Sequence, residues 1–280
     1  MDPADLQREQ RAGLWLEGRS GLYSVPDALA FLREVALALR YGATASLPMA
    51  SMYRATQRQL PDPEDESSAH ARAFDLTNGL LASGQVVEVN LIANRLVLAH
   101  QRVMPAIYAL AGGQPESSLS DSARQALDFI ASNAGATSGE IRRLLRVDGQ
   151  RRPDAADLAL SELQRALLID RGPSSGPSTG VFYLSREGYP YRIFATAHPL
   201  VVAAAKKLDR PAAATALLMT YLAPARFATR RTLLALFKSL LSADEIDAVI
   251  DRQTASGQLE RVRYGREERI VPGSTKLLVC

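Results

Sequence analysis

One four-residue stretch occurs twice and reveals the feature that most constrains this fold, a repeated order of elements. The letters "ASGQ" stand at 82–85 and again at 255–258. Each copy follows a pattern typical of an amphipathic helix and precedes alternating residues typical of a strand. Its Gly suits the left-handed end of a helix. We interpret both copies as one kind of joint, where a third helix ends and a β-hairpin begins.

The chain before the first joint predicts three helices. Ser24 is the expected N-cap of the first helix, whose apolar residues recur every three or four positions until Gly42 stops it. A polar, Pro-rich loop at 59–68 separates the second helix from the third. The predicted elements are helices over 24–41, 47–57 and 68–84, then a hairpin over 85–103 that turns at "ANR".

The same order recurs twice more. The second copy predicts helices over 119–135, 136–147 and 151–169, then a hairpin formed by 168–169 and 181–185 around a Gly/Pro/Ser-rich tip. The third predicts helices over 212–224, 229–237 and 242–257, then a hairpin over 258–271 that turns at Gly265. In the third copy Ser242 and Glu245 have the spacing of a capping box.

Three helices followed by a hairpin is the winged-helix arrangement, a helix-turn-helix with a β wing. We therefore predict an α+β, mainly helical fold built from three tandem winged-helix units. The alternative is one irregular α+β domain. The predicted divisions are an N-terminal segment (1–23), the first unit (24–113), the second unit (114–200) and the third unit (201–280).

Composition excludes several classes of protein. The single cysteine, Cys280, forms neither an internal disulfide nor a cysteine zinc site. The polar start is unlike a signal peptide, and no uncharged apolar run reaches the roughly 18 residues of a membrane span. The chain has 29 Arg but 4 Lys, which is typical of a GC-rich genome. These features favour a bacterial, cytoplasmic protein.

Charge is unevenly distributed along the chain. The net charge is −2 over 1–115, zero over 116–200 and +5 over 201–280. A basic C-terminal third indicates an acidic partner, for which double-stranded DNA is the first candidate. The alternative is a solvated surface rich in arginine.

Three groups of arginines are the candidate DNA contacts. Arg142 and Arg146 are one turn apart, so we expect them to share a helix face. Arg261 and Arg263 are two apart on a strand, so we expect them to share a sheet face. The alternative is that nearby Asp and Glu neutralise them. The full set is Arg142, Arg143, Arg146, Arg151, Arg152, Arg230, Arg231, Arg261, Arg263, Arg266 and Arg269.

The predicted third helices are acidic in the second and third units. Asp154 and Asp157 lie in one, and Asp244, Glu245 and Asp247 in the other. Acidic helices repel phosphate, so they are poor readers of a DNA groove. They suit a second interpretation, in which these helices dock a basic or apolar protein partner.

An enzyme would need a nucleophile, a base or a metal site. The three histidines, His70, His100 and His198, are far apart and lack metal-ligand spacing. The chain contains no P-loop, no dinucleotide-binding glycine pattern and no Gly-x-Ser-x-Gly elbow. We therefore expect no cofactor, no metal and no catalytic residue.

The architecture, with "FLREVALALRYGATASLPMASMYRATQ" and "ATSGEIRRLLRV", resembles the AlkZ-like winged-helix family of DNA glycosylases. The resemblance spans about residues 24–275. It implies a Gln-x-Gln or Gln-x-Asp catalytic pair soon after the first helix. The matching stretch, 35–42, has no Gln, and the nearest triplet is Gln57-Arg58-Gln59 with a charged centre. No catalytic residue is therefore carried over.

Three functions follow from these observations. The first is a DNA-binding protein without catalysis, in repair or regulation, supported by the arginine groups. The second is a DNA glycosylase acting on alkylated or crosslinked bases, which the resemblance implies and the missing pair opposes. The third is an interaction scaffold of winged-helix type, supported by the acidic third helices.

Overall fold

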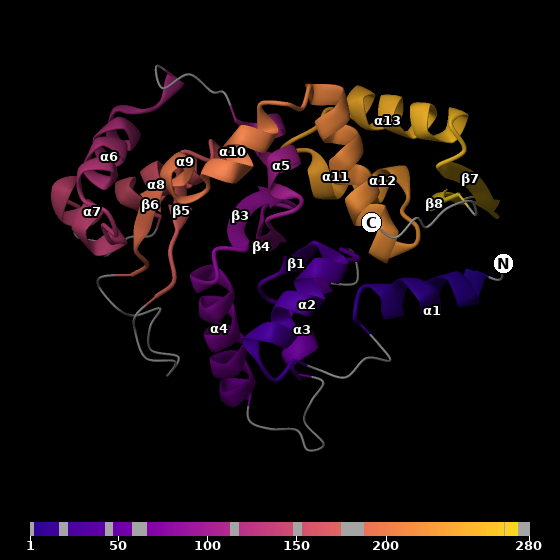
Figure 1. Ribbon diagram of the computed structural model, residues 1–280, viewed down its shortest axis with the longest axis horizontal. Helices are drawn as coiled ribbons and strands as arrows, with labels where there is room; N and C mark the ends of the chain where they lie inside the picture. Colours follow the sequence, from indigo (N-terminus) through magenta and orange to yellow (C-terminus); the bar gives the residue numbers. More distant parts are fainter. Residues whose placement is uncertain are drawn as a thin grey trace.

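The computed structural model describes residues 3–16, 22–42, 47–57, 66–112, 118–147, 153–174, 188–265 and 267–273. It confirms the expected α+β, mainly helical fold class. Figure 1 shows an arched molecule, with the helices of the second unit at one end and those of the third unit at the other. The first unit lies between and below them. The division into three winged-helix units stays a prediction, and we keep the unit names for the residue ranges given above.

The first unit contains more β structure than expected. Its first helix begins after Ser24, whose side chain accepts a hydrogen bond from the Asp27 amide. That helix ends at Val35 because Ala36 takes a left-handed φ of 60°. The first unit comprises α2 (Val25–Val35), β1 (Leu37–Leu39), β2 (Ala50–Ser51), α3 (Met52–Gln57), α4 (Glu66–Ala82), β3 (Val86–Ile92) and β4 (Arg95–His100).

The prediction that the first helix continues to Gly42 is therefore wrong. Residues Leu37–Leu39 instead form β1, at the centre of a sheet with the order β2-β1-β4-β3. All three side chains of β1 are buried. A short apolar run that is buried on both faces fits a central strand as well as a helix, so periodicity alone could not separate the two. Residues 50–51 were also expected to be helical, but they are buried and pair with β1 as the parallel strand β2.

The second unit follows the expected order with one correction. Its three helices begin at polar caps, including capping boxes at Thr137 and Asp154. The strand that pairs with β5 is β6, not the predicted 181–185, which lies outside the described residues. The elements are α6 (Asp121–Ser132), α7 (Ser138–Leu144), α8 (Ala155–Arg165), β5 (Ile169–Arg171) and β6 (Tyr191–Ile193).

The third unit matches its prediction most closely. Ser242 and Glu245 form the expected capping box, and β7 and β8 pair over their full lengths. Gly84 and Gly257, the glycines of the two "ASGQ" joints, have φ values of 69° and 73°. The elements are α11 (Arg210–Ala225), α12 (Arg230–Phe237), α13 (Ala243–Ala255), β7 (Leu259–Tyr264) and β8 (Glu267–Pro272).

Four further helices complete the fold, namely α1 (Pro3–Gly13), α5 (Met104–Ala111), α9 (Phe194–Ala197) and α10 (Pro199–Ala205). Gly13 of α1 lies so close to α11 that an added Cβ would clash with the Pro224 carbonyl oxygen. The first helix of the chain therefore packs against the last third of the sequence, as Figure 1 also shows.

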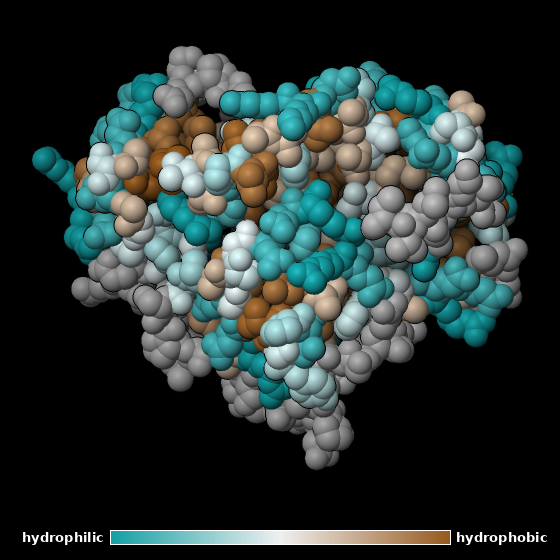
Figure 2. Space-filling view, in the orientation of Figure 1, coloured by the Kyte–Doolittle hydropathy of each residue, from teal (hydrophilic) through white to brown (hydrophobic). Residues whose placement is uncertain are grey.

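The hydrophobic cores do not follow the three units. One large core joins the sheet and α5 of the first unit to α11, α12 and α13 of the third, and also takes in Leu167 and Phe194 of the second. The second unit has a core of its own beneath α6 and α8. On the face seen in Figure 2, hydrophilic residues cover most of the surface, and apolar ones emerge near α8 and α10 and between α4 and α2. Among the described helices, none is long and apolar enough to cross a bilayer.

Candidate nucleic-acid interface

The arginine group of the second unit is divided by the fold. Arg142 is buried, with Nε 2.8 Å from Asp154 Oδ2 and Nη2 2.5 Å from Asp157 Oδ1. Burial disfavours its charge, but hydrogen bonds and the charges of the two carboxylates outweigh burial and raise its pKa. Arg142 therefore joins α7 to the start of α8 and does not reach solvent. Its burial and these two ion pairs leave Arg142 poorly placed for a DNA contact.

The spacing of Arg142 and Arg146 predicted that they share a helix face, but the structure does not place Arg146 on the helix. It lies beyond the end of α7, with a φ of 55°, and is exposed. Arg143 is also exposed on α7. Arg151 and Arg152 lie outside the described residues.

The arginines of the third unit are mostly bound to carboxylates. Arg230 donates two hydrogen bonds of 2.7 Å to Asp247. Arg261 pairs with Asp251 of α13 and with Glu268 on the neighbouring strand. These pairs support the alternative that nearby acids neutralise the arginines.

Arg269 is the second predicted contact that the fold buries. Its guanidinium carbon lies 4.6 Å from the centre of the Phe227 ring and 4.9 Å from that of Tyr264. Its Nε donates to Glu267. Arg269 therefore packs the hairpin onto the body of the third unit, which leaves it poorly placed for a DNA contact. Arg266 lies outside the described residues.

The acidic third helices are neutralised by the same pairs. Asp154 and Asp157 of α8 hold Arg142, and Asp247 and Asp251 of α13 hold Arg230 and Arg261. On the same helix, hydrogen bonds from Arg210 lower the pKa of Glu245 to about 2. All but Asp244 of the carboxylates that suggested a basic protein partner are therefore engaged within the chain, which weakens the charge argument for such a partner.

Three of the predicted arginines are exposed and, within the part of the chain that the structure describes, make no ion pair: Arg146, Arg231 and Arg263. Arg263 stands opposite Glu268 in the β7–β8 register. Figure 1 places α7, near Arg146, and β7, which carries Arg263, at opposite ends of the arch. The structure thus spreads the exposed arginines along the molecule and does not gather them into one patch.

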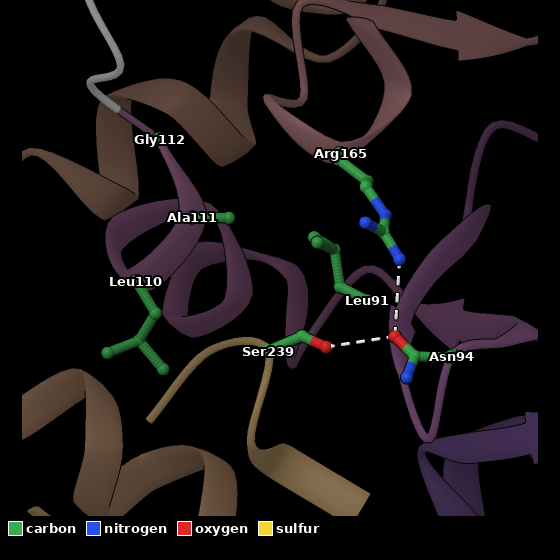
Figure 3. Close-up of a pocket in the computed structure, with 7 residues that line it drawn as sticks. All are labelled: Leu91, Asn94, Leu110, Ala111, Gly112, Arg165 and Ser239. Carbon is green, nitrogen blue, oxygen red and sulfur yellow. Dashed lines mark hydrogen bonds between the residues drawn. The ribbon is translucent and has the colours of Figure 1, made fainter. Parts of the chain in front are cut away.

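The sequence missed a polar junction between all three units. Asn94 at the β3–β4 turn accepts hydrogen bonds from Arg165 at the end of α8 and from Ser239 after α12. These three residues are exposed and line an open pocket of about 500 Å³ (Figure 3). Sequence patterns predicted the turn but carry no signal for which elements its tip contacts.

The sequence also missed a buried ionic cluster between the first and second units. Glu88 of β3 accepts from Arg40, which follows β1, and from Arg171 of β5. Arg40 also donates to the Tyr189 hydroxyl at 2.7 Å. Burial opposes the charge of Glu88, but Arg171 and Arg40 outweigh it and lower its pKa. Tyr189 covers the cluster, with its ring centre 4.4 Å from the Arg171 guanidinium carbon.

The stretch 35–42 occupies the place of the family's catalytic pair. Its residues 35–39 carry no side chain that could transfer a proton. Val35, Ala36 and the three residues of β1 are aliphatic and buried. Arg40 follows them, held in the ionic cluster. Gln57, the nearest glutamine, is exposed at the end of α3 and donates to the Tyr53 hydroxyl. Arg58 and Gln59 lie outside the described residues.

The histidines occupy separate environments. His198 Nε2 is 2.7 Å from Asp170 Oδ2, and His100 Nδ1 accepts from the Arg102 amide. His70 stacks on Tyr53. Among the described residues, no group of three or more His, Cys, Asp or Glu could hold a metal ion.

Comparison with known proteins gives one clear similarity. The structure resembles a Streptomyces sahachiroi DNA glycosylase, AlkZ, with a TM-score of 0.57, over 95% of this chain and 68% of that one. Sequence identity is 16%, so the similarity concerns the fold. It confirms the resemblance to AlkZ-like proteins. No family model matches the chain, and no curated protein matches it in sequence.

Proposed function

We propose that this chain is a DNA-binding protein that does not excise bases. The observation that carries the proposal is the combination of an AlkZ-like fold over 95% of the chain with an aliphatic, buried β1. The fold supports contact with duplex DNA, in repair or regulation. General acid–base chemistry needs a polar group within reach of the reacting atom, and β1 offers none.

Arg231 and Arg263 are the contacts that we expect to matter most. Both are exposed in the basic third unit, and no described carboxylate pairs with either. An arginine that meets a phosphate releases bound counterions, so binding weakens with salt by about one logarithmic unit per contact. Arg146, at the other end of the arch, would add a further contact only to a longer duplex.

The test is fluorescence anisotropy with a labelled duplex over a salt series. We expect affinity to fall steeply with salt, and the double variant Arg231→Ala with Arg263→Ala to reduce the slope by about 2. The matched control is Arg230→Gln with Asp247→Asn, which removes an ion pair between α12 and α13 without changing net charge. An unchanged slope in the arginine variant, or no binding at low salt, would overturn the proposal.

The second candidate is glycosylase activity, which is favoured because the structural neighbour AlkZ is a DNA glycosylase. Incubating the chain with duplex that contains alkylated bases, and measuring the released base, tests it directly. Release that disappears in Gln57→Ala would establish catalysis and contradict the non-catalytic proposal. The absence of release, together with salt-dependent binding, supports the first candidate.

A further inference from the structure

The cavity at the junction of the three units is lined by donors and apolar carbon. Leu91, Leu110 and Ala111 form its apolar wall, and Gly112 lies beside them. Asn94, Arg165 and Ser239 supply its polar groups. The described residues that line it include a guanidinium but no carboxylate. Its volume of about 500 Å³ lies within the range of small-molecule sites.

Hydrogen bonds within the cavity leave its donors available. Asn94 Oδ1 accepts from Arg165 Nη2 at 3.2 Å and from Ser239 Oγ at 3.1 Å. Because the amide oxygen takes both bonds, the amide nitrogen of Asn94 keeps two donors, and Arg165 keeps its remaining N–H groups. Figure 3 shows the three side chains meeting from separate elements. The cavity is thus rich in donors and carries positive charge.

The backbone holds Asn94 firmly at this position. Ala93 and Asn94 have φ values of 54° and 51°, a left-handed pair that Gly and Asn adopt more readily than Ala. The Ala93 amide donates to the Leu236 carbonyl oxygen at 2.7 Å, which attaches the turn to α12. The amide of Asn94 is therefore set in place before any ligand arrives.

We propose that this junction pocket binds a small organic anion. Its phosphate or carboxylate oxygens would be held by Arg165 and the Asn94 amide, and its short apolar part would lie against Leu91 and Leu110. Arginine suits oxyanions because its planar N–H groups donate in pairs. Since the pocket is built from all three units, a bound anion favours the arrangement in which they meet.

The experiment measures thermal unfolding of the whole chain with inorganic phosphate and, separately, with succinate, at constant ionic strength. We expect a saturable rise in the unfolding temperature with at least one of them. Arg165→Gln keeps a donor near Asn94 but removes the charge, and we expect it to weaken binding about tenfold or more. Asn94→Gly removes the amide and suits the left-handed backbone, so it should fold well and also lose the rise.

The control is Lys207→Ala, which removes an exposed positive charge outside the pocket and should retain the full rise. Phosphate also stabilises proteins without binding, so an equal rise in wild type and Arg165→Gln would overturn the proposal. So would the absence of a saturable rise with both anions. Loss of duplex binding in Arg165→Gln, without any rise in wild type, would instead assign the pocket to the DNA surface.

Discussion

The first unit makes two contacts of opposite chemistry. Against the third unit it shares one apolar core, in which Leu37 and Val89 of its sheet belong with Leu217 and Phe237. Against the second unit it adds the buried Arg40–Glu88–Arg171 cluster to an apolar contact in which Tyr108 stacks on Phe194. Apolar burial stabilises an interface at any pH, whereas a buried ionic cluster depends on each partner keeping its charge. The contact with the third unit should therefore persist over a wide range of pH. The contact with the second unit should weaken when Glu88 loses its charge.

The largest expected effect is on the apolar contact. Phe237 is fully buried in the shared core, so Phe237→Ala should lower the free energy of unfolding by about 4 kcal/mol. Urea unfolding followed by circular dichroism measures this loss. Because the core is shared, hydrogen exchange should rise in the first-unit sheet as well as in α12. Exchange that rises in the third unit alone would show that the two units are independent.

Glu88→Gln should have the next largest effect, on the ionic contact. Removing the carboxylate leaves two buried guanidinium groups without their counter-charge, which destabilises by about 3 kcal/mol. Exchange should rise in β5 and β6 but stay low in α11. As a control, Arg40→Met, Glu88→Leu and Arg171→Met together remove every charge and should recover part of the stability. A loss below about 0.5 kcal/mol in Glu88→Gln would mean that the cluster does not hold the units together.

The ionic contact should also respond to pH. The folded state lowers the pKa of Glu88 below its ordinary 4.5, so its contribution is complete above that value and is lost as pH falls through the folded pKa. Urea midpoints of wild type and Glu88→Gln between pH 7 and 3 measure it. The difference between the two proteins should shrink towards pH 3. A difference that stays constant would exclude Glu88 as the titrating group.

The smallest effect concerns a neutral hydrogen bond across the same contact. Asn78 Oδ1 accepts from the Ser174 amide at 3.2 Å, and Asn78→Ala should lower stability by about 1 kcal/mol. Exchange of the Ser174 amide should rise while that of β7 and β8 is unchanged. A larger loss than that of Glu88→Gln would reverse the order and make neutral bonds, not charges, the basis of this contact.

Local signals in the sequence predicted most of the elements. Ser24 and Ser242 cap the helices expected of them, and Gly84 takes the expected left-handed conformation. Caps and left-handed glycines depend on neighbours within four residues, so they can be predicted from the local sequence. The strand β1 was missed because an apolar run of three residues fits either structure, and β6 because it is remote from its partner β5.

The candidate site was less predictable, because the burial and the ion pairs of a charged side chain depend on the tertiary fold around it. Arg142 and Arg146 have the same side chain, yet one is buried between two aspartates and the other is exposed. Whether an arginine reaches solvent depends on which acids the tertiary fold brings near it. The junction at Asn94 depends likewise on three elements that are far apart in sequence.

The shared core also determines when the chain can fold during synthesis. The sheet of the first unit packs against helices beyond residue 210, about 110 residues after its last strand. A ribosome that adds roughly 5–20 residues per second needs several seconds to supply them. Throughout that interval the apolar face of the nascent first unit is uncovered. The second unit, which has a core of its own beneath α6 and α8, is made within the same interval, and that core can form while the first unit still waits for its partner.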